Sequence, residues 1–127
     1  MIAIGVDIVQ VERFNKSVAQ NTKFAKRILT PLELEVFTTR SDKNIDNGRR
    51  YLAKRFAAKE AVSKALGTGI AKGVSFQDIE VLNDGLGAPF VSLFNKALSI
   101  YKQKNAQQIL ISISDEKDFV IAYVTLC

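Results

Sequence analysis

The sequence contains no histidine and a single cysteine, Cys127, among its 127 residues. Without histidine, the protein cannot use Ser-His or Cys-His nucleophilic catalysis, a histidine metal ligand or a histidine general base. One cysteine excludes an internal disulfide and a multi-cysteine zinc site, which fits a reducing compartment. Carboxylates and lysines must therefore carry any chemistry.

Long apolar runs and targeting patterns are also absent. No stretch approaches the roughly 20 apolar residues that span a bilayer, and Met1 to Val6 lack the basic segment and cleavage pattern of a signal peptide. No repeat, low-complexity tract or long linker interrupts the sequence. We therefore expect a cytoplasmic protein with no membrane partner, in which residues 1–127 form a single domain.

The sequence does have an excess of positive charge. Lysine and arginine number 18 against 13 aspartates and glutamates, for a net charge of +5, and 47% of the residues are hydrophobic. The hydrophobic content is sufficient for a core, and the charge favours a phosphate-rich ligand, a nucleic acid or an acidic protein as partner. A domain this short buries a lower fraction of its surface than a larger one, so oligomerisation would add to its core.

The hydrophobic pattern predicts a mixed order of helices and strands, which favours an α+β fold. Asp7 stands at the end of the first expected strand, and the polar stretch 41–49 is expected to be a loop. Thr30 and Pro31 are typical of a helix start, and Gly67 is typical of a helix end. We expect helices over 9–19, 23–29, 31–39, 50–66 and 93–104, and strands over 2–6, 79–82, 90–91, 108–114 and 119–126.

The longest expected helix carries charges within its apolar stripe, and two interpretations are open. At about 100° per residue, Glu60 lies roughly 40° from Phe56 on the helical wheel. In the first interpretation the helix is solvated, and Glu60 pairs with Lys64 at a gain of only about 0.2–0.5 kcal/mol. In the second, the many alanines allow neighbouring elements to approach, so that the enclosed carboxylate needs a cation.

The second interpretation suggests a metal site. An aspartate at a strand end, Asp7, and a glutamate on a helix, Glu60, are oxygen ligands of the kind that Mg²⁺ takes together with waters and phosphates. Lys64 and the backbone amides of Gly67–Gly69 could then meet the phosphates. The Gly-Thr-Gly turn is weak evidence by itself, because glycines are common after helices.

One motif, Gly5–Val9 with Arg13, is followed downstream by a second, Arg55–Ala61 with Lys64–Gly69. In order and spacing, both resemble the holo-acyl-carrier-protein synthases, the short bacterial type of 4′-phosphopantetheinyl transferase. The likeness covers essentially the whole chain, since it continues through 24–30, 76–80, 87–89 and 111–114.

This resemblance implies transfer of the 4′-phosphopantetheine group from coenzyme A to a serine of apo-acyl carrier protein. Adenosine 3′,5′-bisphosphate would be released, and the reaction would support fatty acid biosynthesis. Asp7 and Glu60 would bind Mg²⁺, Lys64 would steady a phosphate oxygen, and either Glu60 or a water on the ion would accept the serine proton. The implied fold has a long central helix packed on a mainly antiparallel sheet, assembled as a homotrimer with active sites between subunits.

The resemblance also implies binding surfaces. Arg55 is a candidate for the adenosine phosphates, as are the basic residues near Arg49, although ordinary surface charge explains Arg49 and Arg50 equally well. The acidic carrier protein would dock on a basic face, where Phe24 and Ile28 could equally be core residues. The coenzyme A cleft would be lined by Lys64, Gly67, Thr68, Gly69, Pro89 and Ser114, and the docking face would comprise Arg13, Lys23, Phe24, Arg27 and Ile28.

Asp115 departs from the family pattern, because many relatives have histidine there. An aspartate would repel a phosphate, so we do not expect a direct phosphate contact at this position. A basic nucleic-acid-binding module, suggested by Arg49, Arg50 and Tyr51, is a rival hypothesis that gives Glu60 no role. A relative that binds without catalysis is another, although it should lack the ligand carboxylates. We expect no nucleic-acid partner.

Overall fold

The structure is a computed structural model that describes residues 2–15 and 22–127. It has an α+β architecture, as the sequence predicted. The elements in chain order are β1 (Ala3–Gln10), the 3-10 helix η1 (Val11–Phe14), α2 (Thr22–Ile28), α3 (Pro31–Lys43), α4 (Ile45–Leu66), the 3-10 helix η2 (Phe76–Asp78), β2 (Ile79–Asn83), β3 (Pro89–Leu93), α5 (Asn95–Gln103), β4 (Ile109–Asp115) and β5 (Phe119–Leu126).

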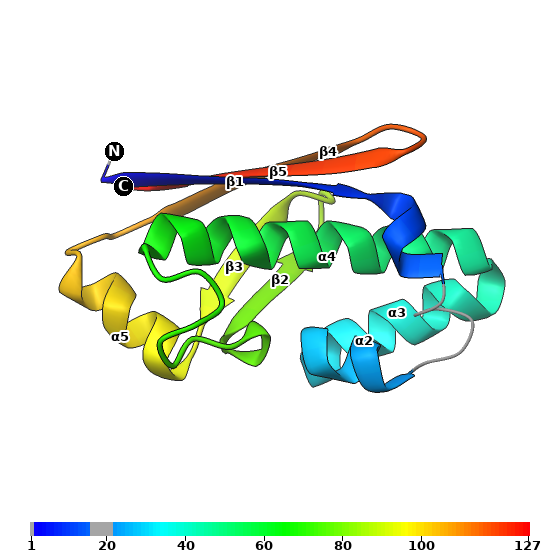
Figure 1. Cartoon of the computed structure of the whole chain (residues 1–127), viewed down its shortest axis with the longest axis horizontal. Helices are drawn as coiled ribbons and strands as arrows, with labels where there is room; N and C mark the ends of the chain where they lie inside the picture. Colours follow the sequence, from blue (N-terminus) through cyan, green and yellow to red (C-terminus); the bar gives the residue numbers. More distant parts are fainter. Residues whose placement is uncertain (1, 16–21) are drawn as a thin grey trace.

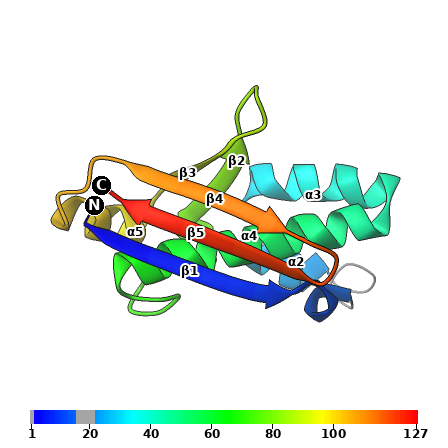
Figure 2. The ribbon, with the colours of Figure 1, turned by 90° about the horizontal axis from the view of Figure 1, so that it is seen from above.

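The long helix α4 lies between two layers (Figure 1). An antiparallel sheet of order β1-β5-β4 covers one side of it, and the hairpin β2-β3 and the helices α2 and α3 lie on the other. Seen from above, β1 and β4 form the two edges of the sheet, with β5 between them (Figure 2). The predicted long helix on a mainly antiparallel sheet is therefore present.

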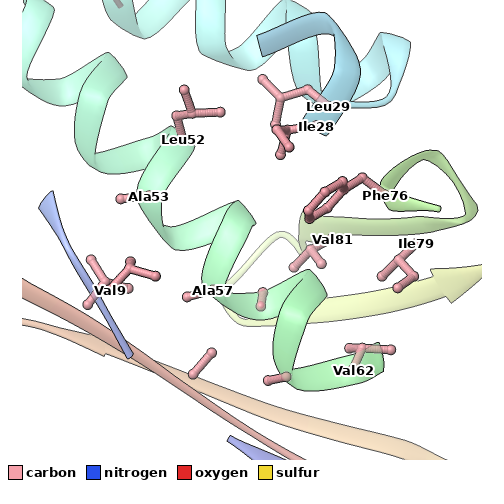
Figure 3. Close-up of a cluster of buried hydrophobic side chains, with 14 of the residues drawn as sticks. Val9, Ile28, Leu29, Leu52, Ala53, Ala57, Val62, Phe76, Ile79 and Val81 are labelled. Atoms are coloured by element: carbon pink, nitrogen blue, oxygen red, sulfur yellow. The ribbon is translucent and has the colours of Figure 1, made fainter. Parts of the chain in front are cut away.

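The core surrounds α4, because small side chains on this helix let both layers approach it. Ala57 and Ala61 are fully buried, and Leu52 and Val62 fill the wider gaps. Figure 3 shows side chains from the sheet and from the hairpin, among them Val81, converging on the helix. In the described part of the chain, no helix is both long and apolar enough to cross a membrane.

Strand β1 is longer than predicted, and Asp7 lies within it instead of at its end. The backbone of β1 pairs with β5 as far as Gln10, which lies opposite Phe119. The predicted helix over 9–19 is therefore wrong at its start, where the strand continues to Gln10 and the short turn of η1 follows it. The rest of that prediction, with its apolar residue Val18, lies outside the described residues.

The predicted loop over 41–49 is also wrong. Helix α3 continues to Lys43 and α4 begins at Ile45, so that only Asn44 separates the two helices. The Asn44 side chain accepts hydrogen bonds from the backbone N–H groups of Asp46 (2.8 Å) and Asn47 (3.2 Å). One capping residue thus satisfies the start of α4, and polar composition was misleading here.

The predicted helix ends are confirmed. Thr30 caps α3, and its side chain and that of Glu33 form a reciprocal capping box, with Pro31 at the first helical position. Gly67 follows α4 in the left-handed conformation, with φ of 89°. A residue with a side chain would be strained there, which explains why glycine ends this helix.

Candidate active site

Asp7 and Lys64 form an ion pair at the β1 edge of the molecule. Alternate β1 residues face α4, and Asp7 is one of them, with a side chain that is 15% exposed. The Lys64 ammonium lies 3.0 Å from Asp7 Oδ1 and also donates to the Val6 carbonyl at 3.0 Å. The Lys64 side chain is half-exposed, so that it can reach both Asp7 and solvent.

Glu60 lies one helical turn before Lys64 and shares this environment. Burial raises the pKa of Glu60, and the nearby negative charge of Asp7 raises it further, while Lys64 and Arg13 act in the opposite direction. The two carboxylates are therefore close enough to repel each other in a partly enclosed place. Such a pair is stabilised by a cation.

Asp7 has an oxygen available for that cation. Its Oδ2 is buried and has no hydrogen-bond partner among the described residues. Two carboxylates, completed by waters and phosphate oxygens, are an ordinary ligand set for Mg²⁺. A group of three or more acidic, cysteine or histidine side chains that could hold a metal is not found in residues 2–15 and 22–127. The residues present thus fit an ion that is shared with a phosphate ligand.

Gly5 determines how closely β1 can approach α4. A Cβ built on Gly5 would lie 1.9 Å from the Ala61 carbonyl oxygen and 2.8 Å from the Ala65 backbone nitrogen. These are backbone atoms and cannot move aside as a flexible side chain would. The absent side chain at Gly5 therefore brings Asp7, two residues later, beside the Glu60 and Lys64 face of the helix.

We expect Gly5→Ala to lower both stability and activity. Its methyl group must push β1 away from α4, which should lower the free energy of unfolding by about 2–3 kcal/mol. A displacement of Asp7 by about 1 Å should also reduce the catalytic rate by about 10²-fold. Urea unfolding and steady-state rates measure the two effects. Gly85→Ala is the matched control, because a Cβ there meets nothing within 4 Å; equal effects in both variants would contradict this role of Gly5.

Contrary to the prediction, the backbone amides of Gly67–Gly69 are not available to phosphates. The Gly67 N–H donates to the Lys64 carbonyl, and those of Thr68 and Gly69 both donate to the Ser63 carbonyl. They satisfy the carbonyls that every helix leaves unpaired at its C-terminus. That prediction is wrong, since the same groups that end α4 cannot also cradle an anion.

Three other predicted cleft residues lie away from Asp7. Arg55 is almost fully buried, donates to the Asn83 side-chain oxygen, and places its guanidinium 4.6 Å from the centre of the Tyr51 ring. Asn83 pairs with Pro89 in the hairpin β2-β3. Ser114 is on β4, at the opposite edge of the sheet from β1. The predicted residues therefore do not come together in one chain: Arg55 and Pro89 lie by the hairpin, and Ser114 lies on the β4 edge.

Ser114 borders an open hollow on the outer face of the sheet. The hollow has a volume of about 380 Å³ and is lined by Ile8, Ser114, Asp115, Glu116, Phe119 and Ile121. It is bordered by apolar side chains and by the turn between β4 and β5. One predicted binding residue, Ser114, thus has a hollow beside it.

Asp115 is held by cations that the sequence did not connect with it. Its carboxylate lies 3.2 Å from Lys54 Nζ and 3.6 Å from Arg50 Nη1, both on α4. Arg50 also donates to the carbonyls of Glu116 (2.9 Å) and Lys117 (2.7 Å), while Arg49 pairs with Asp46. Asp115 and Arg50 therefore fasten the β4-β5 turn to α4, and both arginines have partners within the chain.

Four of the five predicted docking residues reach the surface at least in part, and one does not. Arg13 is exposed and its guanidinium lies 5.3 Å from the centre of the Phe56 ring, and Arg27 is also exposed. Lys23 is exposed as well, and Phe24 is half-buried, 6.2 Å between ring centres from Phe14. Ile28 is fully buried in the core. It cannot contact a partner at the surface, so its assignment to docking is wrong and its helical spacing with Phe24 reflects packing.

Comparisons with known proteins bear on this arrangement. The family model of the 4′-phosphopantetheinyl transferase superfamily matches residues 3–124. A holo-acyl-carrier-protein synthase of Shewanella amazonensis is 47% identical over 130 residues, covering 100% of this chain and 98% of the relative. The crystal structure of the Neisseria meningitidis holo-acyl-carrier-protein synthase superposes with a TM-score of 0.84 at 41% identity, covering 99% of this chain and 98% of that one.

A further solved structure contains a ligand. The Helicobacter pylori holo-acyl-carrier-protein synthase in complex with coenzyme A superposes with a TM-score of 0.80 at 34% identity. The match covers 98% of this chain and 99% of that one. Similarity thus extends over nearly the whole length of both proteins, including the elements that carry Asp7, Glu60 and Lys64.

Proposed function

The chain belongs to the 4′-phosphopantetheinyl transferase superfamily and acts as a holo-acyl-carrier-protein synthase, and we propose that Asp7 and Glu60 hold the Mg²⁺ on which this activity depends. It transfers 4′-phosphopantetheine from coenzyme A to apo-acyl carrier protein. The transfer to a serine hydroxyl and the release of adenosine 3′,5′-bisphosphate follow from the same chemistry. The observation that carries the metal assignment is the buried, unpartnered Asp7 Oδ2 beside Glu60.

The chain's own groups suit phosphoryl transfer without histidine. Such a reaction asks mainly for in-line positioning and for neutralisation of charge on phosphate oxygens. When bound, Mg²⁺ supplies that neutralisation at the pyrophosphate. Lys64, 3.0 Å from Asp7 Oδ1, can turn from this partner to a phosphate oxygen near the scissile bond. Asp7 thereby keeps the ammonium in place before coenzyme A arrives.

Removal of the metal tests the assignment directly. With EDTA, we expect the release of adenosine 3′,5′-bisphosphate to fall to background, because the pyrophosphate would face two carboxylates without an intervening cation. Added Mg²⁺ should restore the rate, and far-UV circular dichroism should not change throughout. Chromatographic measurement of the released nucleotide follows both steps. Full activity in EDTA would contradict a metal held by Asp7 and Glu60.

We also propose that the protein is a homotrimer with its active sites between subunits. Two features support this. The outer face of the sheet exposes a continuous apolar surface, in which Ile4 and Ile8 are 55% and 59% exposed, and a patch of this kind on a soluble protein marks an interface. Its further members are Val6, Leu110, Phe119, Ile121 and Tyr123. We call these seven residues the apolar sheet face.

The separation of the candidate residues within one chain is the second feature. Asp7 is on the β1 edge and Ser114 is on the β4 edge of the sheet. We propose that the β1 edge of one subunit meets the β4 edge of the next in a closed ring, because head-to-tail contacts close in this way. Asp7, Glu60 and Lys64 of one subunit, with Gly67, Thr68 and Gly69 as cleft walls, would then face Ser114 of its neighbour, and Arg55 and Pro89 would complete the coenzyme A site.

The docking of the carrier protein belongs to the same proposal. Arg13, Lys23 and Arg27, with half-buried Phe24 between them, form a basic face suited to an acidic partner. Charges at such a face serve encounter and register more than affinity. We further propose that residues 1–127 work as a single domain in the cytoplasm, in support of fatty acid biosynthesis.

A further inference from the structure

A buried ammonium on α4 lies on a different face of the helix from Glu60. Lys59 is fully buried, and its Nζ donates to the Ile28 carbonyl (2.6 Å), to Glu33 Oε1 (2.6 Å) and to the Phe76 carbonyl (3.1 Å). An ammonium has three donors, and all three are used. Figure 3 shows Ile28 and Phe76 together on this side of α4. Lys59 therefore connects α4 to α2 and to η2.

Glu33 extends the connection to two more elements. Its Oε1 also accepts from the Thr30 N–H at 2.8 Å, and its Oε2 accepts from the Val81 N–H at 2.7 Å. Glu33 is fully buried, so the Lys59-Glu33 pair is shielded from solvent and each charge depends on the other. The pair thus joins five elements at one point: the end of α2, the start of α3, and parts of α4, η2 and β2.

Side chains from elsewhere in the chain hydrogen-bond to the carbonyls at the end of α2. The last carbonyls of any helix lack partners within it. At the end of α2, Lys59 donates to the Ile28 carbonyl from the buried side. Gln77 Nε2 donates to the Lys26 carbonyl (2.6 Å) and, just after the helix, to the Leu29 carbonyl (2.5 Å). The described part of α2 has seven residues, and a helical segment of this length is marginal by itself, so its position depends on these two distant residues.

The arrangement links the docking helix to the catalytic helix. Lys59 and Glu60 are consecutive on α4, and their side chains diverge by about 100°. Glu60 faces Asp7, and Lys59 faces α2, which carries Lys23, Phe24 and Arg27. We propose that Lys59 and Gln77 are positioning residues, which set α2 relative to Asp7 and Glu60 so that a carrier protein docked on α2 presents its serine to the catalytic pair. This inference rests on the proposed function, since it takes α2 as part of the docking face.

Gln77→Met is the sharpest test, because Gln77 is exposed and methionine has a similar length but no donor. Loss of the Gln77 amide should free the Lys26 carbonyl of α2 and the Leu29 carbonyl just after it, and raise the KM for apo-acyl carrier protein about five- to tenfold. We expect kcat and the KM for coenzyme A to change by less than about twofold, because the catalytic pair is untouched. Gln103→Met is the matched control: Gln103 is an exposed glutamine on α5, far from α2 (Figure 1).

A second variant tests Lys59 without leaving an unpaired charge. The double variant Lys59→Met with Glu33→Gln removes both buried charges, which a core tolerates better than the loss of one partner. It should again raise the KM for the carrier protein, by at least as much as Gln77→Met, and leave the Kd for coenzyme A unchanged in calorimetry. Hydrogen exchange should quicken at the amides of 23–29 in both variants.

The outcomes separate a positioning role from a merely structural one. A selective rise in the KM for the carrier protein in both variants supports the inference. A lowered melting temperature with an unchanged KM would overturn it, and so would equal losses for both substrates. A wild-type chain that transfers nothing would overturn the proposed function and this inference together, whereas normal wild-type transfer with unaltered variants overturns the inference alone.

Discussion

Asp7→Asn and Glu60→Gln are each expected to reduce the rate of phosphopantetheine transfer by about a thousandfold while the protein stays folded. Each substitution removes one negative charge with little change in volume. Metal charge stabilises a phosphoryl-transfer transition state by several kcal/mol, which corresponds to a loss of this size. The fold should survive, because the two carboxylates repel each other and removal of one charge relieves that repulsion.

The measurement is a single-turnover rate at saturating Mg²⁺, combined with circular dichroism and a melting curve for each variant. Glu35→Gln is the matched control, because it makes the same chemical change at an exposed position on α3. Retention of near-normal rates in Asp7→Asn or Glu60→Gln would refute the metal role of that residue. A loss of activity that accompanies unfolding would instead point to a structural role.

Ile121→Glu is expected to convert the homotrimer into monomers and to reduce transfer at least tenfold. Ile121 lies on the central strand of the apolar sheet face and is 41% exposed within one chain. Burial of a carboxylate between subunits without a partner costs several kcal/mol, which is enough to raise the dissociation constant of the assembly by orders of magnitude. Activity should fall with assembly, because each proposed site takes Asp7 from one subunit and Ser114 from the next.

Light scattering after size-exclusion chromatography gives the mass of the assembly. Ile45→Glu is the matched control, since Ile45 is 62% exposed at the start of α4 and is not part of the apolar sheet face. The side chain of Ile121 points away from its own core, so the isolated subunit should keep its secondary structure. A fully active monomer would refute the shared site, and an unchanged trimer would refute this face as the interface.

The sequence predicted that residues of the first strand and the long helix come together better than it predicted the geometry around them. Asp7, Glu60 and Lys64 stand in motifs with a definite order and spacing, and β1 and α4 bring Asp7 beside Lys64. The caps at Thr30 and Gly67 could be predicted because each depends on a few consecutive residues. Such local rules survive folding with little interference from distant parts of the chain.

Other features depended on contacts that no short stretch of sequence contains. That Ser114 lies at the opposite edge from Asp7 follows from the strand order β1-β5-β4. Lys59 interrupted an apolar stripe, and only the fold shows that its partners come from residues as distant as Ile28. The sequence did not show that the amides of Gly67–Gly69 donate to the last carbonyls of α4. Buried polar groups form hydrogen bonds with whichever partners the packing brings near, and a short stretch of sequence does not show those partners.

The most direct test of the whole account is the intact mass of an apo-acyl carrier protein after incubation with this protein, coenzyme A and Mg²⁺. The account predicts that the carrier gains the mass of one phosphopantetheine group with the wild-type protein, and that almost none gains it over the same time with Glu60→Gln. A carrier whose mass does not change in the wild-type reaction would contradict it.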